Sequence, residues 1–298
     1  MPQMTFSAKN LWLWRSLAHI PLARRKPEDI HIENILIPRQ EDPKKVRLRI
    51  YRRETQVSLA PVMIWLHGGG YIIGKPEQDD SACIQYVHEL GIVVVSVDYR
   101  CAPEHPFPSA LEDSYTALKW VHAHGGSLGM DASRIAIGGA SAGGGLAAAL
   151  VQYAKNRDEI QPLFQLLVYP MLDDRTCMRQ DLAGRAFLAW SPESNRFGWE
   201  AYLGIKCGAA VVPPYSVPAR AEDLSGLPPA WIGVGTLDLF QDEAVAYGKR
   251  LTDSSVPCEI ILVPGAFHGF DLAGLGAQVV HDFRQSQIEA LRRNLLAG

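Results

Sequence analysis

The hydrophobic positions along this chain follow two patterns, and each predicts a different kind of strand. Ile30 to Pro38 and Val46 to Arg52 alternate apolar and polar residues, which is typical of antiparallel strands at a sheet edge. Asp42-Pro43-Lys44 between them has the composition of a turn. Three later stretches are almost uniformly apolar, as in strands buried on both faces: Pro61 to Leu66, Ile92 to Val97 and Leu163 to Val168.

Helical stretches separate these strands. We expect helices from Glu77 to Leu90, where Gly91 stops the helix, and from a cap at Ser109 to about Ala123. Further strands are expected at Ala230 to Val234 and Glu259 to Val263, and a last helix from about Ala277 to Leu296. Alternating strands and helices favour a mostly parallel sheet with helices on both faces, and the 298 residues suit one domain.

The alternation stops between Met171 and Pro218, a stretch too long for a plain loop and without a buried strand. We therefore expect a small helical subdomain there. An amphipathic helix around Leu11 to Trp14 is expected to join it. Residues from about 1–28 and about 171–218 would together form a cap over the strand ends of a single domain spanning 1–298.

Composition limits the function classes. A net charge of −3 gives no electrostatic reason to expect nucleic acid binding. No apolar run reaches the roughly 18–20 residues of a membrane span, and the N-terminal helix lacks the charge order of a signal peptide. Attachment of that helix to a membrane surface is the second interpretation. Five cysteines without a C-x-x-C pair favour free thiols in a reducing compartment, so we expect a cytoplasmic protein.

One glycine-rich stretch has the spacing of a nucleophile elbow. Gly139-x-Ser141-x-Gly143 lies between a strand-like run from Arg134 to Ile137 and a helix-like run beginning at Leu146. In such a turn, small neighbours leave room for a serine at the tip of a strand-to-helix corner. The alternative is an ordinary glycine-rich turn. A catalytic serine needs a base and a group that orients the base.

Both partners occur in the expected chain order, each after a predicted strand. Asp238 follows the strand that ends at Gly235, and His268 follows the strand that ends at Val263. His67 and His105 are the competing bases, with roles in positioning a loop and in local structure as the alternatives. The competing acids are Asp242, Glu243 and Asp271, of which the first two lie where a helix begins and suit capping better.

A tetrahedral oxyanion also needs backbone donors. The N–H of Ala142, directly after the serine, should supply one, and the turn His67-Gly68-Gly69-Gly70 should supply others. We expect the donors at Gly69 and Gly70, with Gly68 shaping the turn. Neither G-x-x-x-x-G-K-[ST] nor a spaced G-x-G-x-x-G occurs, so nucleotide binding is not expected. No metal or cofactor is implied.

Four motifs together resemble the hormone-sensitive-lipase family of carboxylesterases, also called bacterial family IV. They are His67 to Gly70, Asp98 to Pro108, Gly138 to Gly144, and Asp238 to Glu243 with His268 to Phe270. The resemblance implies the α/β-hydrolase fold, a mostly parallel sheet of about eight strands flanked by helices, with a helical cap that shapes the acyl pocket. It also implies a triad of Ser141, Asp238 and His268. This chain departs from the family at Ala140, Cys101, Leu239 and Phe240.

These observations predict a serine carboxylesterase that acts on small esters with short-to-medium acyl chains. The alternatives are a non-catalytic receptor of the same fold, an amidase and a lipase. A homodimer through the edge of the last strand, Glu259 to Val263, is a further expectation. The predicted pocket residues, which the subdomain's own core explains equally well, are Tyr71, Phe187, Phe197, Trp199 and Tyr202.

Overall fold

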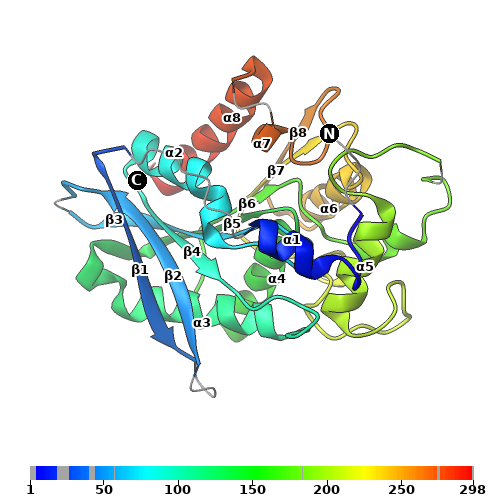
Figure 1. The fold of residues 1–298 in the computed structure, drawn as a ribbon. Coiled ribbons are helices and arrows are strands. Elements are labelled where there is room, and N and C mark those ends of the chain that lie inside the picture. Colours follow the sequence, from blue (N-terminus) through cyan, green and yellow to red (C-terminus); the bar gives the residue numbers. More distant parts are fainter. Residues whose placement is uncertain are drawn as a thin grey trace.

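A twisted β-sheet forms the centre of the molecule (Figure 1). The computed structural model describes residues 5–18, 27–39, 44–56, 58–182, 184–273 and 276–296. Within them the sheet has eight strands in the order β1-β2-β4-β3-β5-β6-β7-β8. The strands are β1 (Ile30–Pro38), β2 (Lys45–Arg53), β3 (Ala60–Leu66), β4 (Val93–Asp98), β5 (Met130–Ala140), β6 (Phe164–Val168), β7 (Ala230–Gly235) and β8 (Cys258–Val263).

Strand direction agrees with the two hydrophobic patterns. β1 and β2 pair antiparallel, and β2 pairs antiparallel with β4. The strands from β4 to β8 in sheet order are parallel to one another. Every residue of β3, β6 and β7 is buried, because helices cover both faces. The predicted mostly parallel sheet with an antiparallel edge is confirmed.

Helices lie on both sides of this sheet, as Figure 1 shows. α2 and α8 cover one face and contact each other, whereas α3 and α4 cover the other face. α6 joins α4 through a 3.0 Å hydrogen bond from Gln152 to the Tyr247 hydroxyl. The helices are α1 (Leu11–Ala18), α2 (Asp80–Leu90), α3 (Ser109–His124), α4 (Ala142–Arg157), α5 (Pro192–Leu203), α6 (Gln241–Asp253), α7 (Phe270–Ala273) and α8 (Gln278–Leu295).

Several predicted boundaries need adjustment. The helix expected from Glu77 begins as the 3-10 turn η1 (Pro76–Asp79) and continues as α2, which Gly91 ends at φ +66° as predicted. The prediction that Ser109 caps α3 is wrong. Pro108 occupies the cap position and Ser109 is the first helical residue, where its hydroxyl makes no capping bond. Residues 42 and 43 of the predicted turn lie outside the described residues.

The long segment between β6 and β7 contains helix α5 and two 3-10 turns, η3 (Asp174–Met178) and η4 (Pro218–Arg220), and no strand within its described residues. Ser191 begins α5 by accepting a 3.2 Å hydrogen bond from the N–H of Ser194, and Gly204 ends it at φ +69°. The N-terminal segment lies beside α5 (Figure 1): the Phe6 N–H donates to the Ser194 hydroxyl at 3.0 Å. Residues 1–4 and 19–26 of the predicted cap lie outside the described residues.

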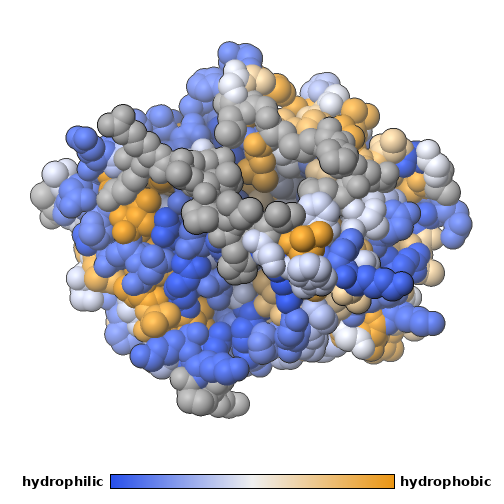
Figure 2. Space-filling view, viewed as in Figure 1, coloured by the Kyte–Doolittle hydropathy of each residue, from blue (hydrophilic) through white to orange (hydrophobic). Residues whose placement is uncertain are grey.

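β8 has β7 as its one neighbour in the sheet and leaves Leu262 44% exposed, so this strand is an edge as predicted. In Figure 2 a small hydrophobic patch lies over α1, the helix that carries the exposed Trp12 and Leu13. Among the described helices, none combines the length and the apolar composition needed to cross a bilayer.

Candidate active site

Ser141 stands at the sharp turn between β5 and α4. Its backbone has φ +57° and ψ −120°, a conformation that costs a residue with a side chain about 1–3 kcal/mol. Hydrogen bonds hold the turn in place. The Ser141 N–H donates to the Val168 carbonyl at 2.9 Å, and the Ser141 carbonyl accepts from the N–H groups of Gly145 and Met171 at 3.0 and 2.9 Å.

The two glycines of the G-x-S-x-G spacing are required by space. A β-carbon at Gly139 would lie 2.4 Å from the carbonyl oxygen of Gly143, and one at Gly143 would lie 2.0 Å from that of Leu66. β5 and the start of α4 approach each other and β3 too closely for any side chain here. The sequence pattern therefore reflects the packing of this corner.

The structure brings together the three side chains singled out by the sequence. His268 Nε2 lies 2.9 Å from Ser141 Oγ, and His268 Nδ1 lies 2.8 Å from Asp238 Oδ2. Asp238 Oδ1 accepts a 2.9 Å hydrogen bond from the N–H of Phe240, which fixes the carboxylate. The three side chains are nearly buried, and each follows the carboxyl end of a parallel strand, β5, β7 or β8. Parallel strands end at one edge of the sheet, which explains how distant residues meet.

Two aromatic rings enclose the imidazole of His268. Tyr169 and Phe240 present their edges to it, with ring centroids 4.9 and 5.0 Å away. The Tyr169 hydroxyl donates to Asp271 at 2.8 Å, and Asp271 pairs with Arg284 at 2.6 Å, so this ring is itself fixed. The sequence analysis missed Tyr169. Its position directly after β6 is the signal that could have identified it.

The competing acids have other partners. Asp242 forms an exposed ion pair with Arg179 at 2.6 Å. Glu243 is buried in the first turn of α6, where it accepts a hydrogen bond from the N–H of Leu172 at 2.7 Å and another from the hydroxyl of Thr176. Burial raises the pKa of Glu243 well above its usual range. Glu243 therefore ties the start of the 171–218 segment to α6, and Asp238 is the acid that contacts His268.

His67 has a structural environment. Its ring is fully buried and stacks on Tyr99 at 4.1 Å, and its Nδ1 lies 2.8 Å from the carbonyl oxygen of Gly68. The Tyr99 hydroxyl donates to the His67 carbonyl at 2.6 Å. Burial lowers the pKa of His67, which keeps the ring neutral. This histidine holds the glycine turn. His105 lies in the loop after β4, where its N–H donates to the Cys101 carbonyl.

The glycine turn lies directly beside the serine. A β-carbon at Gly68 would lie 3.1 Å from the carbonyl oxygen of Ala140 and 3.4 Å from Cβ of Ser141. Gly69 and Gly70 have φ values of +123° and +59°, which turn the backbone sharply at these two positions.

Three N–H groups near the serine make no hydrogen bond to the part of the chain that the structure describes. Among the hydrogen bonds of the described residues, none is donated by the N–H of Gly69, Gly70 or Ala142. Ala142 is the first residue of α4, whose N-terminal N–H groups lack partners within the helix. Backbone donors at a helix N-terminus favour an anion.

The predicted pocket residues are mostly core residues. Tyr71 stacks on Tyr202 at 3.9 Å and lies 5.4 Å from the ring of Trp199, and all three are buried. Phe187 is buried and Phe197 half-buried. These aromatic contacts join α5 to the residue that follows the glycine turn.

Trp190 is a neighbour of the glycine turn that the sequence analysis did not assign. A β-carbon at Gly70 would lie 2.0 Å from Cη2 of Trp190, and one at Gly198 of α5 would lie 2.7 Å from the Gly70 carbonyl oxygen. The indole therefore occupies the space over Gly70.

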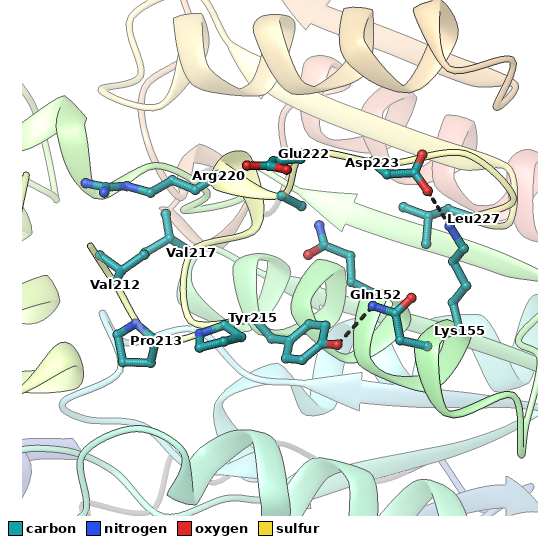
Figure 3. A pocket seen from close by; sticks show the side chains of 13 residues that line it. Gln152, Lys155, Val212, Pro213, Tyr215, Val217, Arg220, Glu222, Asp223 and Leu227 are labelled. Atoms are coloured by element: carbon teal, nitrogen blue, oxygen red, sulfur yellow. Dashed lines mark hydrogen bonds and ion pairs between the residues drawn. The ribbon is translucent and has the colours of Figure 1, made fainter. Parts of the chain in front are cut away.

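A separate cavity of about 390 Å³ lies between α4 and the segment before β7 (Figure 3). Lys155 and Asp223 pair across one end, and the Asn156 amide donates to Tyr215 at 2.9 Å. None of its lining residues contacts the Ser141–His268 pair in the described hydrogen bonds. The part of the chain that the structure describes contains no group of three or more His, Cys, Asp or Glu side chains suited to a metal ion.

Comparison with known proteins places this geometry in a family. The family model for the alpha/beta hydrolase fold matches residues 63–272, which include all three side chains of the hydrogen-bonded chain. The protein belongs to the α/β-hydrolase family. The predicted resemblance to its hormone-sensitive-lipase branch is confirmed.

Relatives of this α/β-hydrolase carry esterase names. Esterase LipI of Mycobacterium tuberculosis is 38% identical over 71% of this chain and 66% of its own length. Carboxylesterase NlhH of the same species is 33% identical over 85% of this chain and 79% of its own length. A bacterial heroin esterase superposes with a TM-score of 0.91 at 34% identity, covering 99% of this chain and 94% of that chain. This α/β-hydrolase is thus a carboxylic ester hydrolase.

Proposed function

We propose that the protein hydrolyses small carboxylic esters with short-to-medium acyl chains through an acyl-enzyme on Ser141. His268 Nε2 takes the Ser141 proton as the oxygen attacks the ester carbonyl. Asp238 accepts the Nδ1–H of His268, which keeps the correct tautomer and stabilises the imidazolium. The alcohol leaves with the proton from His268. Water, activated by the same imidazole, then releases the acid.

In this proposal the tetrahedral oxyanion binds between the glycine turn and the start of α4. Gly69, Gly70 and Ala142 donate their free N–H groups, while Gly68 shapes the turn beside Ser141. The donors are fixed before the substrate binds, so no reorganisation is needed as charge develops. Each such donor contributes roughly 2.7–4 kcal/mol to transition-state stabilisation.

The observation that carries the proposal is the continuous hydrogen-bonded chain from Asp238 through His268 to Ser141. It sits at a strained corner next to unpaired backbone donors. A receptor that only binds ligand has no need of this chain, which disfavours the non-catalytic alternative. A fluorophosphonate probe distinguishes the two, because it labels only an activated serine: labelling of Ser141 supports the esterase, and an unlabelled folded protein supports the receptor.

The direct test replaces Ser141 by alanine. The variant should lose turnover of a p-nitrophenyl ester while unfolding at the same temperature as the parent. Ser96→Ala is the matched control, since Ser96 is a fully buried serine on β4. Retained turnover in Ser141→Ala would overturn the assignment of the nucleophile. Mass spectrometry of the quenched reaction should place the acyl group on Ser141.

Residues from about 1–28 and 171–218 are proposed to act as a cap over the site. Phe6 and α5 contact each other, and α5 in turn packs on Tyr71 next to the glycine turn. Tyr71, Phe187, Phe197, Trp199 and Tyr202 would set the depth of the acyl pocket. Because bulky rings occupy this space, short and medium acyl chains fit better than long ones. A series of p-nitrophenyl esters from acetyl to palmitoyl tests this, and a maximum at the long end would contradict it.

Amide hydrolysis uses the same groups, so matched amide and ester substrates should be compared. Faster amide turnover would make the protein an amidase.

We also propose a homodimer through β8, supported by its open edge and the exposed Leu262. A cytoplasmic location is supported by five free cysteines, as expected in a reducing compartment.

A further inference from the structure

We propose that Cys177 and Cys207 are a redox-active dithiol, which hydrogen peroxide converts into a disulfide across helix α5. Cys177 lies in η3, before α5, and Cys207 lies shortly after its end. The proposed esterase reaction uses neither thiol.

The backbone brings these two cysteines together. A β-carbon at Gly208, next to Cys207, would lie 2.6 Å from Cγ of Met178, next to Cys177. The Gly208 N–H also donates to the Asp174 carboxylate of η3 at 2.7 Å. The segments before and after α5 are therefore packed against each other at the two thiols.

Side chains of α5 contact both thiols. The Cys207 thiol donates to Glu200 Oε1 on this helix at 3.8 Å. Arg196, on α5 between them, donates from Nη2 to the Cys177 carbonyl at 2.7 Å and points Nη1 at the Cys207 sulfur at 3.9 Å. The Asn195 amide donates to the Cys177 sulfur at 3.4 Å. Both sulfurs are thus held by the same helix.

The two thiols differ in acidity, as an attacking and a resolving thiol do. The neighbouring Cys177 thiol lowers the pKa of Cys207 and the charge of Arg196 adds to the effect, whereas burial opposes it. The neighbouring Cys207 thiol, followed by burial, raises the pKa of Cys177. Burial raises the pKa of the remaining cysteines, Cys83, Cys101 and Cys258, which makes them poor nucleophiles.

A small polar oxidant has a route to Cys177, the neighbour of Cys207. Cys177 lines a cavity of about 250 Å³ together with Arg179, Arg185 and Arg196. Cys177 and Cys207 are 7% and 5% exposed, which excludes large reagents and admits small ones. Hydrogen peroxide is small enough to enter, and Arg196, which lines the cavity and contacts the Cys207 sulfur, stabilises the negative charge that develops as its O–O bond breaks.

The chemistry balances with peroxide as the two-electron oxidant. The Cys207 thiolate attacks one peroxide oxygen and the O–O bond breaks, which gives a sulfenic acid on Cys207. The departing hydroxide takes up the proton that the Cys207 thiol released on ionisation and becomes water. The sulfur of Cys177 then attacks the Cys207 sulfur. The S–O bond breaks, and the hydroxyl leaves as a second water with the Cys177 proton. The net change is two thiols and one peroxide to one disulfide and two waters.

The bond would close a loop that contains all of α5. This helix carries Trp199 and Tyr202, which pack on Tyr71 beside the glycine turn. Oxidation therefore constrains the segment that covers the turn. Such constraint raises the unfolding midpoint, by about 5 °C for a chain of this size.

The test is peroxide treatment of the full protein, followed by alkylation and peptide mapping without reduction. We expect one cross-linked peptide pair containing Cys177 and Cys207, lighter by two hydrogen atoms and lost after dithiothreitol. Cys83, Cys101 and Cys258 should stay reduced during the peroxide treatment and therefore be found alkylated. Oxidation confined to those three, or sulfinic acid on Cys207 without the cross-link, would overturn the proposal.

A second measurement uses stability. Peroxide should raise the unfolding midpoint of the parent and of Cys258→Ser by about 5 °C, and dithiothreitol should reverse the rise. Cys207→Ser should show no rise. If Cys207→Ser responds as the parent does, or if the cross-linked parent shows no rise, the proposed constraint is wrong. Because peptide mapping needs no ester turnover, the result is independent of the proposed esterase activity.

Discussion

The backbone at Gly143 lies so close to Leu66 that a β-carbon at position 143 would be 2.0 Å from the Leu66 carbonyl oxygen. Leu66 ends β3 and leads into the glycine turn, and Gly143 is the second residue of α4, two positions after Ser141. This contact sets the distance between the serine and the proposed oxyanion donors. The two halves of the site are therefore joined through backbone, without a side chain between them.

Gly143→Ala should separate these halves. We expect a loss of about 3 kcal/mol of stability from the overlap and a fall in kcat of roughly 100-fold from misplaced groups. Gly126→Ala is the control, because a β-carbon there meets nothing within 4 Å. Urea unfolding and ester kinetics measure both effects. Equal behaviour of the two variants would refute the proposed role of this contact.

Asp238→Asn should lower kcat by about 10⁴-fold, since an amide favours the wrong tautomer of His268. Asp242→Asn should leave kcat nearly unchanged, because the Asp242–Arg179 ion pair is exposed. Kinetics with a p-nitrophenyl ester test both. A large loss in Asp242→Asn with a small one in Asp238→Asn would identify a different acid.

Asp79 should make stability depend on pH. Its carboxyl is buried and accepts a 2.8 Å hydrogen bond from Trp65, and burial raises its pKa from 3.8 to about 6. The folded state therefore holds the proton more tightly than the unfolded state. The contribution of Asp79 to the free energy of unfolding is greatest below pH 4, falls as the pH rises to 6, and is then constant. The total loss of this contribution is about 3 kcal/mol.

Asp79→Asn tests this, because the amide oxygen still accepts from Trp65 and carries no charge. The variant should lack this component of the pH dependence. Its free energy of unfolding should therefore increase relative to that of the parent as the pH rises from 4 to 6. Urea unfolding at several pH values measures the difference. Parallel curves for the two proteins would show that Asp79 does not titrate in this range.

Leu262→Lys should weaken the proposed dimer by placing a charge on the edge strand β8. Leu237→Lys is the control, because Leu237 is 54% exposed in the loop after β7. Light scattering coupled to size exclusion gives the mass of each. A parent that is a monomer, or a Leu262→Lys variant that dimerises as the parent does, would exclude this interface.

The sequence predicted most of the fold because the central strands are buried on both faces and leave continuous apolar runs. The elbow was predictable for a similar reason, since close backbone contacts at Gly139 and Gly143 exclude every other residue. The cap at Ser109 was mispredicted because Pro108 takes that position.

Contacts between distant side chains left no such signal. Trp190 covers Gly70, but no local spacing distinguishes this tryptophan from the other aromatic residues of its segment. The approach of Cys177 to Cys207 likewise depends on how the segment around α5 folds back. These features are set by tertiary packing, which a one-dimensional pattern does not encode.

The position of Trp190 over Gly70 has a consequence for engineering substrate preference. The indole belongs to the segment between β6 and β7, yet it rests on a glycine whose amide is a proposed donor to the reacting carbonyl. Exchanging that segment for one from a relative would change the acyl pocket and the support of this amide at once. Chimeras that keep Trp190 in place should retain turnover while their selectivity changes, and those that replace it should lose rate on every ester alike.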